Sequence, residues 1–187
     1  GEFTRELVRR NSPELEFELA RSLERGKDLS WMREMTWPIS DLKKSPWTHG
    51  LLLSKVSDPK DKKLLPNLRH FKRLFKKYKI EPLLLEQYVG RRTELGGITA
   101  RYAEIAKKLR LPLISTSAFA ADLKKQDPSI WWTASDGSAT EEQSFLRACI
   151  IAKRLCKKSI VLDSPLHNMK LPEARRKLIL EAVNRAK

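Results

Sequence analysis

A run of basic residues without interleaved acids is the strongest chemical signal in this sequence. Between Pro66 and Ile80 there are six cations and no Asp or Glu: Arg69, Lys72, Arg73, Lys76, Lys77 and Lys79. On a helix, each close pair of like charges costs roughly a few tenths of a kcal/mol, and a phosphate backbone relieves that repulsion. We therefore predict a nucleic-acid contact face. The alternative is the solvated face of an amphipathic helix.

A loop rich in glycine and arginine, residues 90–99, follows a strand candidate and precedes a helix candidate. Glycines before a helix amino terminus let backbone N–H groups approach a phosphate, and arginine adds paired donors. Both GxGxxG and GxxxxGK are missing, so this is neither a dinucleotide fingerprint nor a P-loop. We predict a phosphate contact, with a plain turn as the alternative. The candidate residues are Arg91, Arg92, Gly96, Gly97 and Thr99.

Three carboxylates lie near the ends of later strand candidates: Asp136, Glu142 and Asp163. Carboxylates that converge at strand ends can hold Mg²⁺ for phosphodiester hydrolysis. Helix capping explains Glu142 equally well. A metal-dependent nuclease is therefore the alternative function, and we predict no metal or cofactor.

Two adjacent tryptophans, Trp131 and Trp132, face opposite sides if their segment is extended. One ring can then stack on an unpaired base, and we assign this role to Trp132. Burial of both rings under helices is the alternative.

The overall charge favours a polyanionic partner. The 187 residues include 38 Lys and Arg against 23 Asp and Glu, a net charge of +15. With 41% apolar residues the chain is not intrinsically disordered, and no apolar run approaches the roughly 20 residues that span a bilayer. We expect a nucleic acid, with RNA slightly favoured over DNA because the candidate contacts are loops and an aromatic pair. An interaction domain that meets acidic proteins or other subunits of a larger complex is a further alternative.

The two cysteines, Cys149 and Cys156, lie seven residues apart on one predicted helix, which prevents a local disulfide. Neither CxxC nor a Cys/His ligand spacing occurs. We expect core thiols in a reducing, intracellular compartment. The first residues, Gly1, Glu2 and Phe3, are typical of a cloning remnant, so we expect a domain of a longer protein.

Residues 1–47 are predicted to form a helical, Trp-rich extension. The first 35 residues have helical character, and Ser12, Pro13 and Glu14 are typical of a helix start. Three tryptophans follow between Trp31 and Trp47, where large side chains would pin an irregular segment to a surface.

Residues 48–187 are predicted to form a basic α/β domain. Strand candidates alternate with helix candidates, and a capping box at Thr140 to Gln143 marks the clearest helix start. This alternation predicts a mostly parallel or mixed sheet of about four or five strands covered by helices. Residues 100–125 also allow a helix-turn-helix, although 112–115 looks more like a buried strand. We recognise no family over any substantial stretch. The strand candidates are 51–56, 82–89, 113–115, 130–133 and 159–163.

Overall fold

The computed structural model divides the chain into two compact units. The first, which we call the helix unit, comprises Gly1–Leu19, Gly90–Thr93 and Thr116–Lys187. The second, the sheet unit, comprises Ala20–Val89 and Glu94–Ser115. The residues that the structure describes are 2–15, 29–35, 40, 42–43, 46–53, 62–86, 95–135 and 138–186.

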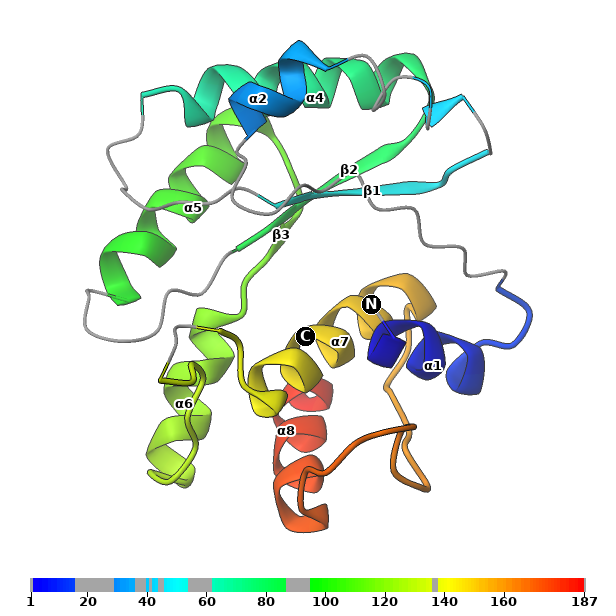
Figure 1. Ribbon diagram of the computed structural model, residues 1–187, viewed down its shortest axis with the longest axis vertical. Helices are drawn as coiled ribbons and strands as arrows, with labels where there is room; N and C mark the ends of the chain where they lie inside the picture. The colour runs from blue at the N-terminus through cyan, green and yellow to red at the C-terminus, as the bar shows by residue number, and fades with distance from the viewer. Residues whose placement is uncertain are drawn as a thin grey trace. The chain divides into compact units, whose positions relative to one another are not determined.

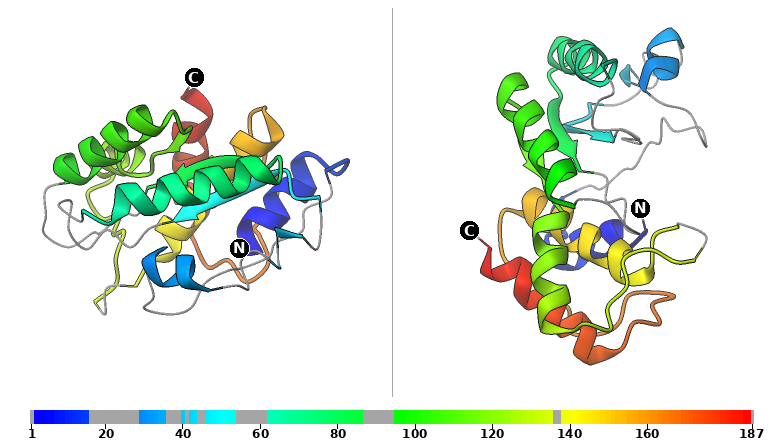
Figure 2. Two further views of the ribbon diagram at one scale, coloured as in Figure 1. Left: turned by 90° about the horizontal axis from the view of Figure 1, so that it is seen from above. Right: turned by 90° about the vertical axis from the view of Figure 1, so that its left-hand side faces the viewer.

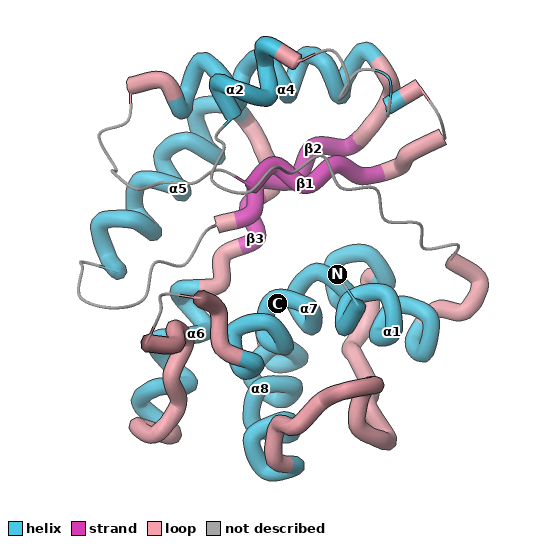
Figure 3. Tube along the Cα trace, in the orientation of Figure 1, coloured by secondary structure: helices cyan, strands magenta, loops and turns pink. Residues whose placement is uncertain are grey.

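The sheet unit contains a parallel sheet in the order β1-β2-β3 (Figure 3). Parallel strands need crossover connections, and helices α4 and α5 supply the two that this sheet requires. A short helix, α2, packs on α4 (Figure 1). The elements are β1 (His49–Leu53), β2 (Glu81–Leu85), β3 (Leu113–Ile114), α2 (Leu29–Glu34), α4 (Leu64–Lys77) and α5 (Leu95–Leu109).

Helices α4 and α5 lie against the sheet (Figure 2). Buried residues of both helices and of the strands form one hydrophobic core. Leu52 of β1 and Leu84 of β2 are register partners, and both belong to this core. Gly50 fixes the distance of α4 from β1, because a Cβ at this position would lie 2.3 Å from Cε2 of Phe75. The close approach therefore requires glycine. Core residues from the helices include Leu68, Phe71, Phe75, Tyr102, Ile105, Ala106 and Leu109.

The helix unit is built around α7, which packs against α1 and α8. The predicted cap of α7 is confirmed, since Oγ1 of Thr140 accepts from the Gln143 N–H at 3.3 Å. The reciprocal half of the capping box is not formed, because the Thr140 N–H donates to the Trp132 carbonyl. The helices of this unit are α1 (Glu2–Asn11), α6 (Ser117–Gln126), α7 (Glu141–Cys156) and α8 (Glu173–Arg185).

The α/β class is confirmed, but the sheet has three strands among the described residues rather than four or five. Residues 130–133 contribute only an isolated antiparallel bridge from Thr133 to Ala139. Residues 159–163 form no strand. Side chains satisfy their backbone instead: Asn184 pairs with the N–H and C=O of Ile160, and Asn11 does the same for Val161. Each asparagine takes the place of a neighbouring strand.

The N-terminal prediction fails at Ser12. Helix α1 ends at Asn11, and a turn follows in which the Leu15 N–H donates to the Ser12 carbonyl at 2.9 Å. Proline restricts the residue before it and cannot continue a helix, so Pro13 ends one here. No separate Trp-rich extension is seen among the described residues, because α1 belongs to the helix unit and α2 to the sheet unit. None of the described helices is long and apolar enough to cross a membrane.

Candidate nucleic-acid interface

Helix α4 turns one face to the core and presents its basic residues on the other. Leu68, Phe71 and Phe75 are buried, as the 3.6-residue period predicts. The exposed residues of the basic face are Arg69, Arg73, Lys76 and Lys77, whereas Lys72 is half-buried. The predicted helix and its two faces are thus confirmed.

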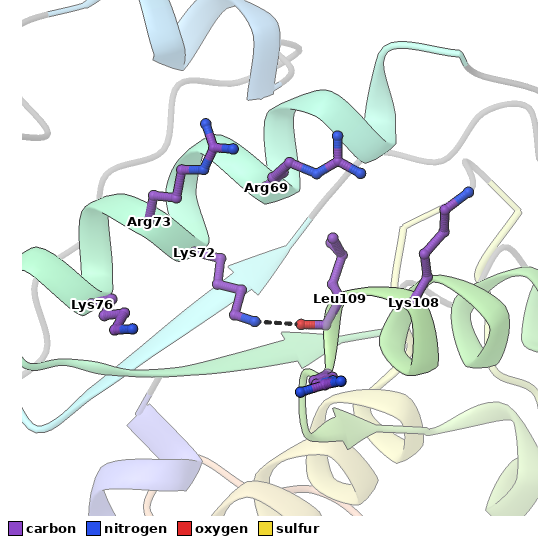
Figure 4. A pocket seen from close by; sticks show the side chains of 7 residues that line it. Arg69, Lys72, Arg73, Lys76, Lys108 and Leu109 are labelled. Atoms are coloured by element: carbon purple, nitrogen blue, oxygen red, sulfur yellow. Dashed lines mark hydrogen bonds between the residues drawn. The ribbon is translucent and has the colours of Figure 1, made fainter.

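A hollow of about 430 Å³ lies between this basic face and the last turn of α5. Figure 4 shows the side chains that line it, which come from both helices. Six of the seven lining residues are cations, and none is a carboxylate. They are Arg69, Lys72, Arg73, Lys76, Lys108, Leu109 and Arg110.

A second hollow of about 450 Å³ adjoins the first and shares Lys72, Lys76 and Arg110 with it. It adds Lys79 and one acidic residue, Glu81. We call the two hollows together the basic groove. Its cations are Arg69, Lys72, Arg73, Lys76, Lys79, Lys108 and Arg110.

Lys72 holds the two walls of the groove together. Its Nζ donates to the Leu109 carbonyl at 2.6 Å, drawn as a dashed line in Figure 4. Carbonyls in the last turn of a helix have no partner within the helix, and a cation there also suits the helix dipole. Lys72 therefore fixes α4 against the end of α5, in addition to its charge.

Two cations enter the groove from the same kind of helix end. Lys79 after α4 and Arg110 after α5 have positive φ angles of 58° and 50°. The next residue in each case bonds back across the turn: Ile80 N–H to the Phe75 carbonyl and Leu111 N–H to the Ala106 carbonyl, both at 2.9 Å. This is the Schellman arrangement, in which the left-handed position is usually glycine. Here it carries a charge.

The helix dipoles do not account for this concentration of charge. The carboxyl end of a helix has about half a negative charge, so the ends of α4 and α5 together offer about one. The lining residues of the groove comprise seven cations and one carboxylate, Glu81, which is far more positive charge than the two helix ends would balance. The pKa of His70 on α4 is lowered from its ordinary value by burial first and then by the charges of Arg33 and Arg73. The residues that line the groove therefore carry a large excess of positive charge.

The predicted glycine site lies at the other edge of the sheet. Helix α5 begins at Leu95, so Gly96 and Gly97 are in its first turn rather than in the preceding loop. Thr99 donates through Oγ1 to the buried carboxylate of Glu86 at 2.9 Å, and Ser115 donates to the same carboxylate at 2.6 Å. A buried carboxylate at this position opposes a phosphate. Arg91 and Arg92 lie outside the described residues.

The groove itself lies at the amino edge, where β2 begins with Glu81 and Pro112 precedes β3. Helix α5 has 15 residues, so its two ends are roughly 20 Å apart. The structure therefore does not bring the two predicted phosphate sites together. The structure adds Lys108 and Arg110 to the site. Neither residue was predicted as a contact. The only signal for them in the sequence is that they lie at the basic end of a predicted helix.

The assignment of base stacking to Trp132 is contradicted by its burial. Trp132 is 4% exposed and cannot offer a ring face to a base, whereas Trp131 is 67% exposed. The ammonium of Lys124 lies 4.3 Å from the Trp131 ring centroid, a cation–π contact. Alternation correctly separated a buried ring from an exposed one but did not identify which was which.

The three carboxylates of the nuclease alternative do not form a site in the described residues. Glu142 binds Arg175 at 2.8 Å, Asp163 is exposed, and Asp136 lies outside the described part of the chain. No three His, Cys, Asp or Glu side chains among the described residues come together as metal ligands. The helix-turn-helix alternative fails because β3 intervenes between α5 and α6 and pairs with β2.

Both cysteines are free. Cys149 is buried in α7, and burial raises the pKa of its thiol. A thiol held in its neutral form is a poor nucleophile and a poor metal ligand, so Cys149 acts as a small apolar core residue.

Comparison of the chain with protein-family models, with curated proteins and with solved structures gave no match in any of the three.

Proposed function

We propose that the sheet unit binds nucleic acid through its phosphate backbone, in the basic groove. One observation carries the proposal: seven cations, from one face of α4 and from the carboxyl ends of α4 and α5, line two adjoining hollows together with a single carboxylate, Glu81. Among the described residues, Lys72 is the one groove cation whose side chain is hydrogen-bonded, and it donates to a backbone carbonyl rather than to a carboxylate. The positive charge is thus available to a polyanion.

The arrangement favours backbone contact over base recognition. A helix that reads bases enters the major groove of DNA, which is about 12 Å wide. Helix α4 is flanked by α2 and by the end of α5, and its apolar face is buried in the core. Helix α4 therefore cannot enter the major groove, because neighbouring helices lie on both sides of it. A concave basic surface follows a backbone instead, and we place RNA slightly ahead of DNA.

The test compares two variants that carry the same total charge. The groove variant replaces Arg69, Arg73, Lys76 and Lys108 by glutamine and leaves Lys72 in place because it joins the two helices. The control replaces two arginines and two lysines on the exposed surface of the helix unit: Arg5, Arg9, Lys158 and Lys170. Each variant has a formal charge of +11, from 15 minus 4.

We expect the groove variant to bind labelled single-stranded RNA and DNA about tenfold or more weakly. The dependence of log affinity on log salt becomes shallower by about 0.7 to 0.9 for each phosphate that the variant no longer neutralises. The control retains its affinity within about twofold, because surface cations outside a built site contribute only weak, screened, long-range attraction. Fluorescence anisotropy at several salt concentrations measures both quantities. Equal reductions in the two variants, or none in the groove variant, would contradict the proposal.

A further inference from the structure

The two hollows of the basic groove form a pair of adjoining compartments with shared cations. The two hollows have similar volumes, about 430 and 450 Å³. The residues common to both are Lys72, Lys76 and Arg110. A ligand whose anionic groups repeat along a chain can occupy both compartments at once, whereas a single anion occupies one.

Arg110 differs from the other shared cations in what its side chain can do. Lys72 is already engaged with the Leu109 carbonyl, and Lys76 offers a point charge. A guanidinium has five N–H donors in a planar fork and can serve two anionic groups from opposite edges. Arg110 lines both hollows and makes no side-chain hydrogen bond or ion pair with the described residues.

The two compartments are unequal in charge. The first has Arg69, Arg73 and Lys108 to itself. The second has only Lys79, and Glu81 lies beside it. A first phosphate therefore prefers the first compartment, and a second phosphate is held mainly by Arg110 and Lys79.

We propose that the basic groove binds two consecutive phosphates of a single nucleic-acid strand, with Arg110 bridging them. This inference rests on the proposed function and adds the minimal ligand, which is a strand with two neighbouring phosphates. It predicts that the affinity for an oligonucleotide rises sharply when the number of its phosphates increases from one to two.

The backbone offers a clean way to remove Arg110. Its φ of 50° is a left-handed conformation that glycine adopts without steric cost, so Arg110→Gly deletes the side chain and relaxes the turn. Lys79, with φ 58°, allows the same change in the second compartment alone. Lys157 ends α7 with φ 54° and lines neither hollow, so Lys157→Gly is a matched control in the helix unit.

The experiment is a competition assay in which uridine 5′-phosphate and its 5′-phosphorylated dimer and trimer displace a labelled oligouridine. For the wild type we expect the dimer to bind about tenfold more tightly than the monomer, since a second charge-assisted interaction is added. Arg110→Gly abolishes this step and lowers the salt slope for the oligomer by about 0.7, the value for one single-strand phosphate, because the first phosphate keeps the cations of the first compartment. Lys79→Gly lowers the slope by about 0.7, and Lys157→Gly leaves it unchanged.

All three glycine variants should melt about 2–4 °C above the wild type, because each relieves a left-handed residue. If Arg110→Gly melts lower instead, Arg110→Lys decides, since lysine keeps the charge but cannot bridge and should also abolish the length step. A length step in Arg110→Gly or Arg110→Lys equal to that of the wild type would overturn the inference. The proposed function survives that result as long as the four-residue groove variant binds weakly, and it fails separately if that variant binds normally. Equally tight binding of polyglutamate would overturn the assignment to phosphates.

Discussion

Arg175 on α8 and Arg73 on α4 are both arginines on amphipathic helices, but only Arg175 is tied to carboxylates of its own unit. Its guanidinium binds Glu142 at 2.8 Å, Asp127 at 3.3 Å and the Ser129 hydroxyl at 2.8 Å. Arg73 makes no ion pair with the described residues and lines the first hollow. The same residue type thus acts as an internal cross-link in one unit and as a free charge in the other.

The contrast extends to lysines. Lys153 of α7 donates to the Val183 and Asn184 carbonyls at 2.9 and 3.1 Å and so caps the end of α8. Lys76, on the basic face of α4, has no such bond among the described residues. The net charge alone therefore does not identify a binding site. A cation with a partner in its own unit stabilises the fold, whereas a cluster of cations without such partners on a concave surface is available to bind an anionic ligand.

Breaking the cross-link should produce the largest effect on stability. Arg175→Met keeps much of the side-chain volume and leaves Glu142 and Asp127 without their cation. We expect the free energy of unfolding to fall by about 2–3 kcal/mol, because hydrogen bonds to charged groups at a partly buried site are removed. Urea denaturation measures it, and nucleic-acid affinity of the folded protein should stay unchanged.

The matched control is Lys177→Met on the same helix. Lys177 pairs with Glu173 at 2.7 Å, but both side chains are about two-thirds exposed. Solvent and salt screen such a surface pair, so the free energy of unfolding of this variant should stay close to that of the wild type. A weaker affinity in Arg175→Met, measured where the protein is fully folded, would show that the helix unit contributes to binding, and the comparison between the units would then fail.

The asparagines that replace strand partners give the next largest effect. Asn184→Ala leaves the N–H and C=O of Ile160, a residue only 2% exposed, without partners. We expect the free energy of unfolding to fall by about 1–3 kcal/mol, the cost of an unsatisfied buried polar group. Asn11→Ala should cost less, because Val161 is 58% exposed and water can replace the missing bonds. Urea denaturation of the two variants ranks them, and equal costs would contradict this account.

The same residues show why part of the fold was predictable and part was not. Local signals were sufficient for the cap at Thr140, for the two faces of α4 and for the apolar runs of the three parallel strands. The run 159–163 has the composition of a buried strand, yet its partners are side chains 24 and 150 residues away. No local pattern contains that information.

The candidate site divides in the same way. The cations of α4 were predictable because they occur in one uninterrupted segment. Lys108 lies in α5, which begins 18 residues after α4 ends, and Arg110 directly follows it. Both join the site only because the crossover between β2 and β3 brings the end of α5 to the basic face of α4. Conversely, Thr99 was predicted to bind a phosphate, but its hydroxyl donates to the buried carboxylate of Glu86. Glu86 lies 13 residues earlier, before the glycine loop, so no local pattern indicates that the two residues are partners.

The smallest effect concerns protonation of His70 on α4, whose pKa depends in part on Arg73, one of the groove cations. Its pKa is lowered by burial and by the charges of Arg33 and Arg73. The unfolded chain then binds the proton more tightly than the folded chain, so stability is complete above the ordinary histidine pKa of about 6.5 and declines as the pH falls through the lower folded value. Arg73→Gln removes one repulsive charge. We expect it to raise the pKa of His70 and to make stability decline less at acid pH.

A phosphate bound near Arg73 should move the His70 pKa in the same direction, because it neutralises the same charge. An NMR titration of the His70 ring in the wild type, with and without saturating oligonucleotide, measures this shift. The Arg73→Gln variant should show a smaller shift on binding than the wild type, since part of the repulsion is already gone. If oligonucleotide leaves the His70 titration unchanged while it binds tightly, the phosphates lie away from Arg73, and the first hollow, which Arg73 lines, is not the binding site.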